Sequence, residues 1–141
     1  MIANFLKLGM VVWSVVSLFG CAESVPVERW YTQDQVTIGK PLYQKYCASC
    51  HGNSGQGDQN WDRPNKDGSY PPQPLNGSGH SWHHSLSWLE NKVAKGKIHP
   101  GTVMPGFANI LDRDQRKAVI AAFQDFWNDR VYTAWLKRSG I

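Results

Sequence analysis

The chain has 141 residues, of which 41% are hydrophobic, and its 15 Lys and Arg against 11 Asp and Glu give a formal net charge of +4. This length suits a single domain whose own hydrophobic core would be thin. The positive excess is too mild for a nucleic-acid-binding protein, so we expect no nucleic-acid partner.

The first 20 residues have the pattern of an export signal. Lys7 supplies a positive charge ahead of residues 8–19, an apolar run without charge. A membrane-spanning helix needs about 20 such residues, whereas the shorter run is typical of a signal peptide. The run ends in Leu-Phe-Gly-Cys at residues 18–21, which resembles the bacterial lipobox. We therefore predict that residues 1–20 are removed and that Cys21 becomes a lipid anchor.

Two other outcomes stay open for this segment. Cleavage after Ala22 would release a soluble protein, and an uncleaved run would itself anchor the chain. All three outcomes export the domain, so we expect it on the periplasmic side, held at the membrane as a lipoprotein. Residues 21–35 show little periodicity and are predicted to be a tether, which leaves residues 36–141 as the folded domain.

A helix is predicted to lead into the central motif. Pro41 is tolerated only in the first turn of a helix, so we expect this helix to begin near residues 37–40 and to continue to Tyr46. Gly39 and Tyr43 are four residues apart and share one face of it.

The central motif is Cys-Ala-Ser-Cys-His at residues 47–51, and C-x-x-C-H is the attachment signature of c-type haem. Cys47 and Cys50 can form thioethers with two vinyl groups of one porphyrin, and His51 then ligates the iron. A zinc site would need four protein ligands, or three and a water, and the chain has no second cysteine pair. A thioredoxin-like site would need a βαβ setting. We therefore predict one covalent haem c, which leaves no cysteine pair for a disulfide.

Residues 52–79 show no sustained periodicity and are rich in Gly, Asn, Asp and Pro. A loop this long in a small domain indicates a function, here the wrapping of a haem edge. Trp61, Tyr70 and Leu75 are the apolar residues that could seal it. The 13 Gly, 8 Pro and 7 Trp of the chain suit a loop-rich shell around a large flat cofactor.

Three histidines, His80, His83 and His84, follow this loop together with Trp82. They have three possible roles: capping and packing of the next helix, contact with haem propionates, or binding of a second metal. The indole N–H of Trp82 could donate to a propionate, or the ring could fill the core.

The next helix is predicted from Ser87-x-x-Glu90, a capping box, and from Leu86, Leu89 and Val93 at helical spacing, with Gly96 ending it. Met-Pro-Gly-Phe follows at residues 104–107. Met104 is the only methionine outside the signal, and a lone methionine is often packing filler.

The last helix begins at a second capping box, Asp112-x-x-Gln115. Its apolar face has a period of 3.6 residues and consists of Val119, Ala122, Phe123, Phe126 and Trp127. Arg130, Lys137 and Arg138 suit the C-terminal end of this helix or an extension of it.

Over roughly residues 36–135 the chain resembles the class I cytochromes c of bacteria, through the Gly39–Tyr43 pair, the C-x-x-C-H motif and the M-P-x-F motif. The resemblance implies that Met104 binds the iron opposite His51, with His99 as the competing ligand. It implies that Phe123 or Trp127 packs on the Gly39–Tyr43 pair. It also implies that a proline-containing turn offers a backbone carbonyl to His51, although Gln73 occupies the usual proline position.

The resemblance further implies an all-α fold of three to four helices with long loops around one covalent haem. Such a protein carries electrons as its iron alternates between Fe(III) and Fe(II), and His/Met ligation raises its potential. We therefore expect an electron carrier rather than an enzyme, a monomer with protein redox partners. The alternatives are a haem-based sensor or metal-binding module that uses His80, His83 and His84, and a small haem peroxidase, which would need an open iron position.

Overall fold

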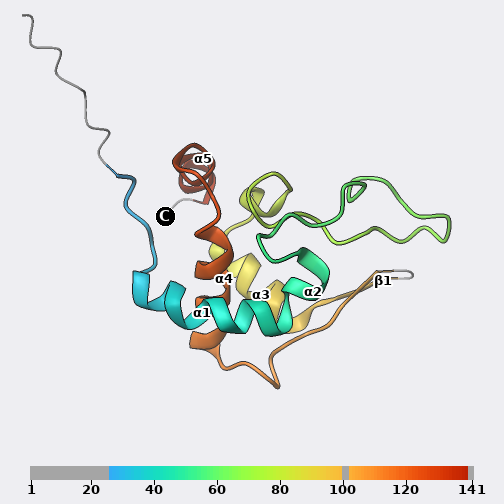
Figure 1. Cartoon of the computed structure of the whole chain (residues 1–141), viewed down its shortest axis with the longest axis horizontal. Helices are drawn as coiled ribbons and strands as arrows, with labels where there is room; N and C mark the ends of the chain where they lie inside the picture. Colours follow the sequence, from blue (N-terminus) through green and yellow to red (C-terminus); the bar gives the residue numbers. More distant parts are fainter. Residues whose placement is uncertain (1–25, 100–101, 140–141) are drawn as a thin grey trace, which may run out of the picture.

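The computed structural model describes residues 26–99 and 102–139, and the chain is mainly helical over these ranges (Figure 1). Its elements are α1 (Gln33–Tyr46), α2 (Ala48–His51), the 3₁₀-helix η1 (Ser81–His83), α3 (Leu86–Lys95), β1 (Lys97–His99), β2 (Thr102–Met104), α4 (Arg113–Gln124) and α5 (Asp129–Ser139). The predicted all-α fold is confirmed. The described residues contain five α-helices, more than the expected three to four, and a short antiparallel hairpin, β1–β2, which was not predicted.

The predicted signal peptide and Cys21 lie outside the described residues. Within the described ranges, no helix has the length and the apolar character that a membrane crossing requires.

Helix α1 begins earlier than the sequence predicted. Thr32 caps it, because its side chain accepts from the backbone N–H of Gln35 while the Gln35 side chain accepts from the backbone N–H of Thr32. Pro41 therefore lies inside the helix, where it lacks one hydrogen-bond donor. The prediction of a start near residues 37–40 was wrong, because capping and tertiary packing outweigh the cost of this proline.

The most extensive contact between two elements joins α1 and α4. Gly39 makes this contact possible, since a Cβ atom on it would overlap the carbonyl of Ala118 and lie 3.0 Å from the Cβ of Ala122. Tyr43 packs edge-on against Phe126, with ring centroids 5.6 Å apart. The predicted partners, Phe123 and Trp127, instead pack on each other, with ring centroids 6.2 Å apart.

The ends of α3 and α4 follow local sequence rules with one correction. Gly96 ends α3 at φ +70°, and Asp112 with Gln115 forms the predicted capping box of α4. The cap of α3 is Ser85, whose hydroxyl accepts from the N–H of Trp88, and not the predicted Ser87. Because α3 begins at Leu86, Ser87 already lies inside its first turn, and the carboxylate of Glu90 pairs with Arg113 at 3.0 Å.

The C-terminal region is two helices rather than one extended helix. Helix α4 ends at Gln124, and Asn128 then caps α5 by accepting from the N–H of Val131 at 2.9 Å. Lys137 and Arg138 lie in the last turn of α5 as predicted, whereas Arg130 lies near its start.

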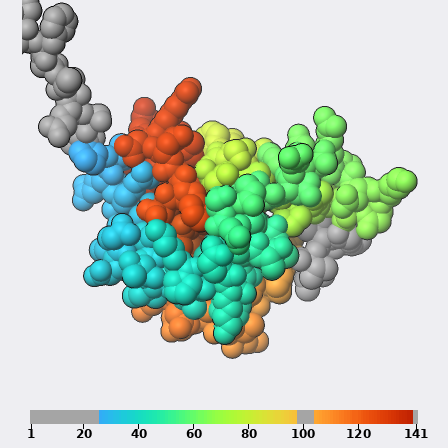
Figure 2. Space-filling view, viewed as in Figure 1, coloured from blue at the N-terminus to red at the C-terminus, as the bar shows by residue number. Residues whose placement is uncertain are grey.

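Residues 29–31 pack on this C-terminal region, so the folded part of the chain begins before the predicted boundary at residue 36. The guanidinium of Arg29 pairs with Asp129 at 2.6 Å and lies 4.0 Å from the ring centroid of Tyr132. The backbone N–H of Trp30 donates to the Tyr132 hydroxyl. Figure 2 shows this blue segment against the red surface of the C-terminal helices, and the green loop of residues 58–72 projecting at the other end. The stretch predicted as a tether is therefore partly structural.

Candidate haem site

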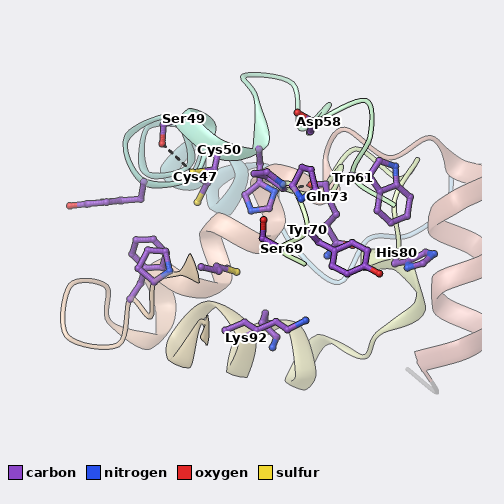
Figure 3. Close-up of a pocket in the computed structure, with 18 of the residues that line it drawn as sticks. Cys47, Ser49, Cys50, Asp58, Trp61, Ser69, Tyr70, Gln73, His80 and Lys92 are labelled. Carbon is purple, nitrogen blue, oxygen red and sulfur yellow. Dashed lines mark hydrogen bonds between the residues drawn. The ribbon is translucent and has the colours of Figure 1, made fainter. Parts of the chain in front are cut away.

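A cavity of about 1040 Å³ opens between the C-x-x-C-H motif and the segments that follow it (Figure 3). This volume lies at the upper end of the range for small-molecule sites. Four segments line it: the end of α1 with α2, the loop of residues 58–73, the stretch from His80 to Lys92, and the chain from Lys97 to Phe107. The cavity thus gathers the motifs that the sequence analysis placed far apart.

Cys47 and Cys50 both line the cavity, and both are free thiols. Helix α1 ends where the backbone N–H of Cys47 donates to the carbonyl of Tyr43 at 2.8 Å, and α2 carries Cys50 and His51. Burial, and secondarily the nearby Cys50, raises the pKa of Cys47 to about 11. The Cys47 thiol is therefore protonated at neutral pH and partly shielded, which suits a covalent attachment point better than a redox-active cysteine pair.

The imidazole of His51 is fixed by a single hydrogen bond. Its Nδ1 lies 2.8 Å from the carbonyl oxygen of Gln73. A carbonyl can only accept, so Nδ1 carries the proton and Nε2 is left with its lone pair. Burial lowers the pKa of His51, and the bond to Gln73 only partly opposes this effect. His51 is therefore a neutral imidazole, the form that ligates a metal, and Gln73 supplies the carbonyl expected from the proline-containing turn.

Met104 is presented at the cavity by the β1–β2 hairpin, in which it pairs with Lys97. The chain beyond it is held by a bond of 3.0 Å from the N–H of Phe107 to the carbonyl of Val93. Gly96 allows the close approach, since a Cβ atom there would meet the backbone of residues 104–106. Met104 and His51 also share a smaller hollow of about 50 Å³ beside the core. For His99, the competing ligand, only the backbone in β1 is described.

The three neighbouring histidines have different surroundings. His80 and His84 line the cavity, whereas His83 does not. The ring of His84 stacks on Trp88 with centroids 3.6 Å apart, and burial with the neighbouring His83 lowers the pKa of His84. In the described part of the chain, no group of three or more His, Cys, Asp and Glu is placed to hold a metal ion. Trp82 packs against the core.

The far end of the cavity is polar and aromatic. Figure 3 places Trp61, Tyr70 and His80 across the cavity from the two cysteines. The edge of the Trp61 ring meets His80, with centroids 4.7 Å apart. Trp61 and Tyr70 line the cavity as predicted, whereas Leu75 lines only the smaller hollow.

One wall of the cavity was not predicted from the sequence. It consists of Trp88 and Lys92 on α3, with Tyr46 and Phe107 nearby. The ammonium of Lys92 lies 4.9 Å from the ring centroid of Trp88, whose other neighbour is His84. Positions 84, 88 and 92 follow one another at intervals of four residues. Residues at this spacing lie on one side of a helix, so the spacing could have predicted that these side chains form one surface.

These residues fit a covalent c-type haem. The cavity offers two free thiols, a neutral imidazole with an unbonded nitrogen and a thioether sulfur, each on its wall. Haem iron in proteins of this type takes one histidine and one methionine as axial ligands. The donor set of the site therefore matches both the covalent and the coordinate bonds that such a group requires.

The chain was compared with protein families, with curated proteins and with solved structures. The model of the family described as "Cytochrome C oxidase, cbb3-type, subunit III" matches residues 34–121. The comparison with curated proteins and the comparison with solved structures gave no match. The matched range contains the C-x-x-C-H motif, the Gln73 turn and Met104, and it ends within α4.

Proposed function

The chain belongs to the family described as cytochrome c oxidase, cbb3-type, subunit III, a family of c-type cytochrome domains with covalent haem c, and from this membership we propose that it is an electron carrier in an exported redox chain. Haem-based electron transfer is the function of such a domain. When bound, the haem supplies an iron that alternates between Fe(III) and Fe(II).

In this proposal each residue of the site has a separate task. Cys47 and Cys50 would hold the porphyrin through thioethers, and His51 and Met104 would ligate the iron. Gln73 keeps the imidazole of His51 in one tautomer and one orientation through the bond of 2.8 Å. These tasks need no proton transfer and no movement of the ligands, which suits a carrier whose two oxidation states must have similar structures.

One observation carries the proposal: His51 and Met104 line the same cavity, and His51 keeps Nε2 free for a metal. If both residues ligate the iron, the protein would leave no coordination position open for an oxidant or a gas. The peroxidase alternative needs such an open position, and a gas sensor would need Met104 to leave the iron. An electron carrier needs neither.

The test is a redox titration of the purified protein followed by exposure of the reduced form to carbon monoxide. We expect a reversible one-electron titration and a reduced spectrum that carbon monoxide leaves unchanged. Rapid binding of carbon monoxide by the native protein would instead favour a sensor or a peroxidase, because it would mean that the Met104 side of the iron is open.

The proposal includes a location and partners. The apolar run that ends at Cys21 supports an exported lipoprotein on the periplasmic side of the membrane. Protein donors and acceptors would meet the domain there, and a cytochrome c oxidase is the acceptor class that the description of the family suggests. We propose that the domain acts as a monomer.

A further inference from the structure

The turn that carries the Gln73 carbonyl has few backbone N–H groups with which to form hydrogen bonds. Three of the five residues 71–75 are prolines. Proline has no backbone N–H, so this segment can donate few hydrogen bonds and depends on its carbonyls for attachment. The hydrogen bonds that the carbonyls of residues 71–75 accept therefore hold the Gln73 carbonyl, and with it the imidazole of His51, in place.

Four consecutive carbonyls of this segment accept hydrogen bonds from four different parts of the chain. The donors are the backbone N–H of Asp58 to Pro72 (2.9 Å), Nδ1 of His51 to Gln73 (2.8 Å), the hydroxyl of Ser81 to Pro74 (3.5 Å) and the indole Nε1 of Trp127 to Leu75 (2.7 Å). On the other side, the N–H of Leu75 donates to the carbonyl of Gly55 at 2.7 Å.

Trp127 is the strongest side-chain support of the segment apart from His51 itself. Its bond to Leu75 is short, whereas the bond from Ser81 to Pro74 is at the limit of hydrogen-bond length. The indole of Trp127 is 2% exposed and packs on the rings of Phe123 and Trp135. Because the donor is buried and fixed, the carbonyl of Leu75 has one well-defined position.

We propose that Trp127 is a positioning residue for the axial histidine. By fixing the carbonyl of Leu75, it fixes the carbonyl of Gln73 two residues earlier, and this carbonyl orients His51. The inference rests on the proposed function, in which His51 ligates haem iron. Trp127 lies beyond residues 34–121, the range that matches the family, so the contacts of this chain alone support the assignment. The strength of the bond at Nδ1 tunes a metal-ligating histidine, so Trp127 would act on the iron through three intermediaries, Leu75, Gln73 and His51.

The chain offers a matched control for this role. Trp135 is also fully buried, and its indole Nε1 donates to the carbonyl of His84, again at 2.7 Å. The two tryptophans therefore make the same kind of bond from the same C-terminal region, but to different segments. Replacing either by phenylalanine removes one buried indole bond and leaves one buried carbonyl unpaired, so the losses of stability should be similar.

The experiment compares Trp127→Phe and Trp135→Phe in the full-length, haem-bearing protein. The measured quantity is the exchange rate of the Nδ1 proton of His51, followed by NMR in the reduced, diamagnetic state. We expect exchange about tenfold faster in Trp127→Phe and within about twofold of the wild type in Trp135→Phe. Equal acceleration in both variants would mean a general loss of stability and would overturn the assignment, as would an unchanged rate in Trp127→Phe.

A second replacement guards against misfolding. Benzothienylalanine at position 127 keeps the shape of the ring and removes only the N–H donor, and it should reproduce the faster exchange. A wild-type rate in this protein would overturn the proposal even if Trp127→Phe exchanges rapidly. A wild type without a His51-ligated haem would overturn both the proposed function and this inference, whereas a normal haem with unchanged exchange would overturn only the inference.

Discussion

Tyr43 joins the first helix to the turn that follows the C-x-x-C-H motif. Its side chain is 1% exposed, and its hydroxyl donates to the carbonyl of Gly52 at 2.8 Å. Burial, and secondarily the nearby Cys47, raises the pKa of Tyr43 above the ordinary value of 10.0. The folded protein therefore keeps this phenol neutral where the unfolded chain would ionise it. Its contribution to stability is complete below pH 10 and is lost as the pH rises toward the folded-state pKa.

Replacing Tyr43 by phenylalanine should change the free energy of unfolding differently at neutral pH and above pH 10. At pH 7 the variant loses one buried hydrogen bond, and the free energy of unfolding should fall by about 1 kcal/mol. Above pH 10 the variant has no phenol to ionise, so its stability should fall less steeply with pH than that of the wild type. Denaturant unfolding at several values between pH 7 and pH 11 measures both effects. Parallel curves for the two proteins would refute the assignment of the titrating group.

Met104 has a test that is independent of folding. In Met104→Ala the two cysteines are untouched, so the haem should remain covalently attached while one axial position loses its ligand. The iron should become high-spin or take up another ligand, and the reduction potential should fall because methionine ligation raises it. Optical spectra and a redox titration measure these changes. The control is His99→Gln, and a low-spin spectrum that survives in Met104→Ala but disappears in His99→Gln would identify His99 as the ligand.

At the scale of elements, the contact between α1 and α4 depends on the absence of a side chain at Gly39. In an ordinary helix, replacing glycine by alanine stabilises by about 1 kcal/mol. Here the added methyl group would overlap the carbonyl of Ala118, which is backbone and cannot rotate away. Gly39→Ala should therefore destabilise by about 2 kcal/mol or more, measured by thermal unfolding. Ile38→Ala, on an exposed residue of the same helix, should change stability by less than about 0.5 kcal/mol. A Gly39→Ala variant as stable as the wild type would mean that the two helices are not in close contact.

The sequence predicted those elements whose signals are local. The capping box at Asp112 and the stop at Gly96 each depend on a few adjacent residues, and the structure confirms both. The start of α1 was misplaced because the rule against Pro41 was applied without the cap at Thr32.

Two other errors involve contacts between residues distant in sequence. Ser87 was predicted as the cap of α3 because Glu90 completes a capping box, whereas Ser85 caps the helix and Glu90 pairs with Arg113, 23 residues away. Phe126 contacts Tyr43 because the chain turns between α4 and α5, a break that a continuous helical period does not show. Local patterns determine where an element can form, and tertiary contacts decide which of the possible partners is used.

At the scale of the whole molecule, segments at the two ends of the described chain pack together. Arg29 and Trp30 contact Tyr132 on α5, while α5 reaches η1 and donates from Trp135 to His84. Arg29 and Trp30 precede residues 34–121, the range that matches the family, and α5 follows it. No sequence periodicity predicts a contact of this kind, so residues 29–31 were predicted to be part of a tether. The domain thus has an additional layer that links its N-terminal entry to the loops around the cavity.

The proposed lipid anchor can be tested independently of the haem. If Cys21 is lipidated, the mature protein should sediment with membranes and be released only by detergent, because two or more acyl chains bind a membrane stably. Cys21→Ala should block this modification and leave haem attachment unchanged. The intact mass of the mature protein measures the outcome. A mature chain that begins after Ala22 and carries no lipid would exclude the anchor.

We propose that one covalent haem is held by Cys47 and Cys50 and ligated by His51 and Met104. The most direct measurement is the optical spectrum of the purified wild-type protein in its oxidised and reduced states. We predict a low-spin c-type spectrum, haem that stays with the polypeptide after denaturation, and in the oxidised protein a weak charge-transfer band from sulfur to iron. A high-spin spectrum, or a low-spin spectrum without that band, would contradict ligation by Met104, and haem extracted by acidic solvent would contradict attachment through the two cysteines.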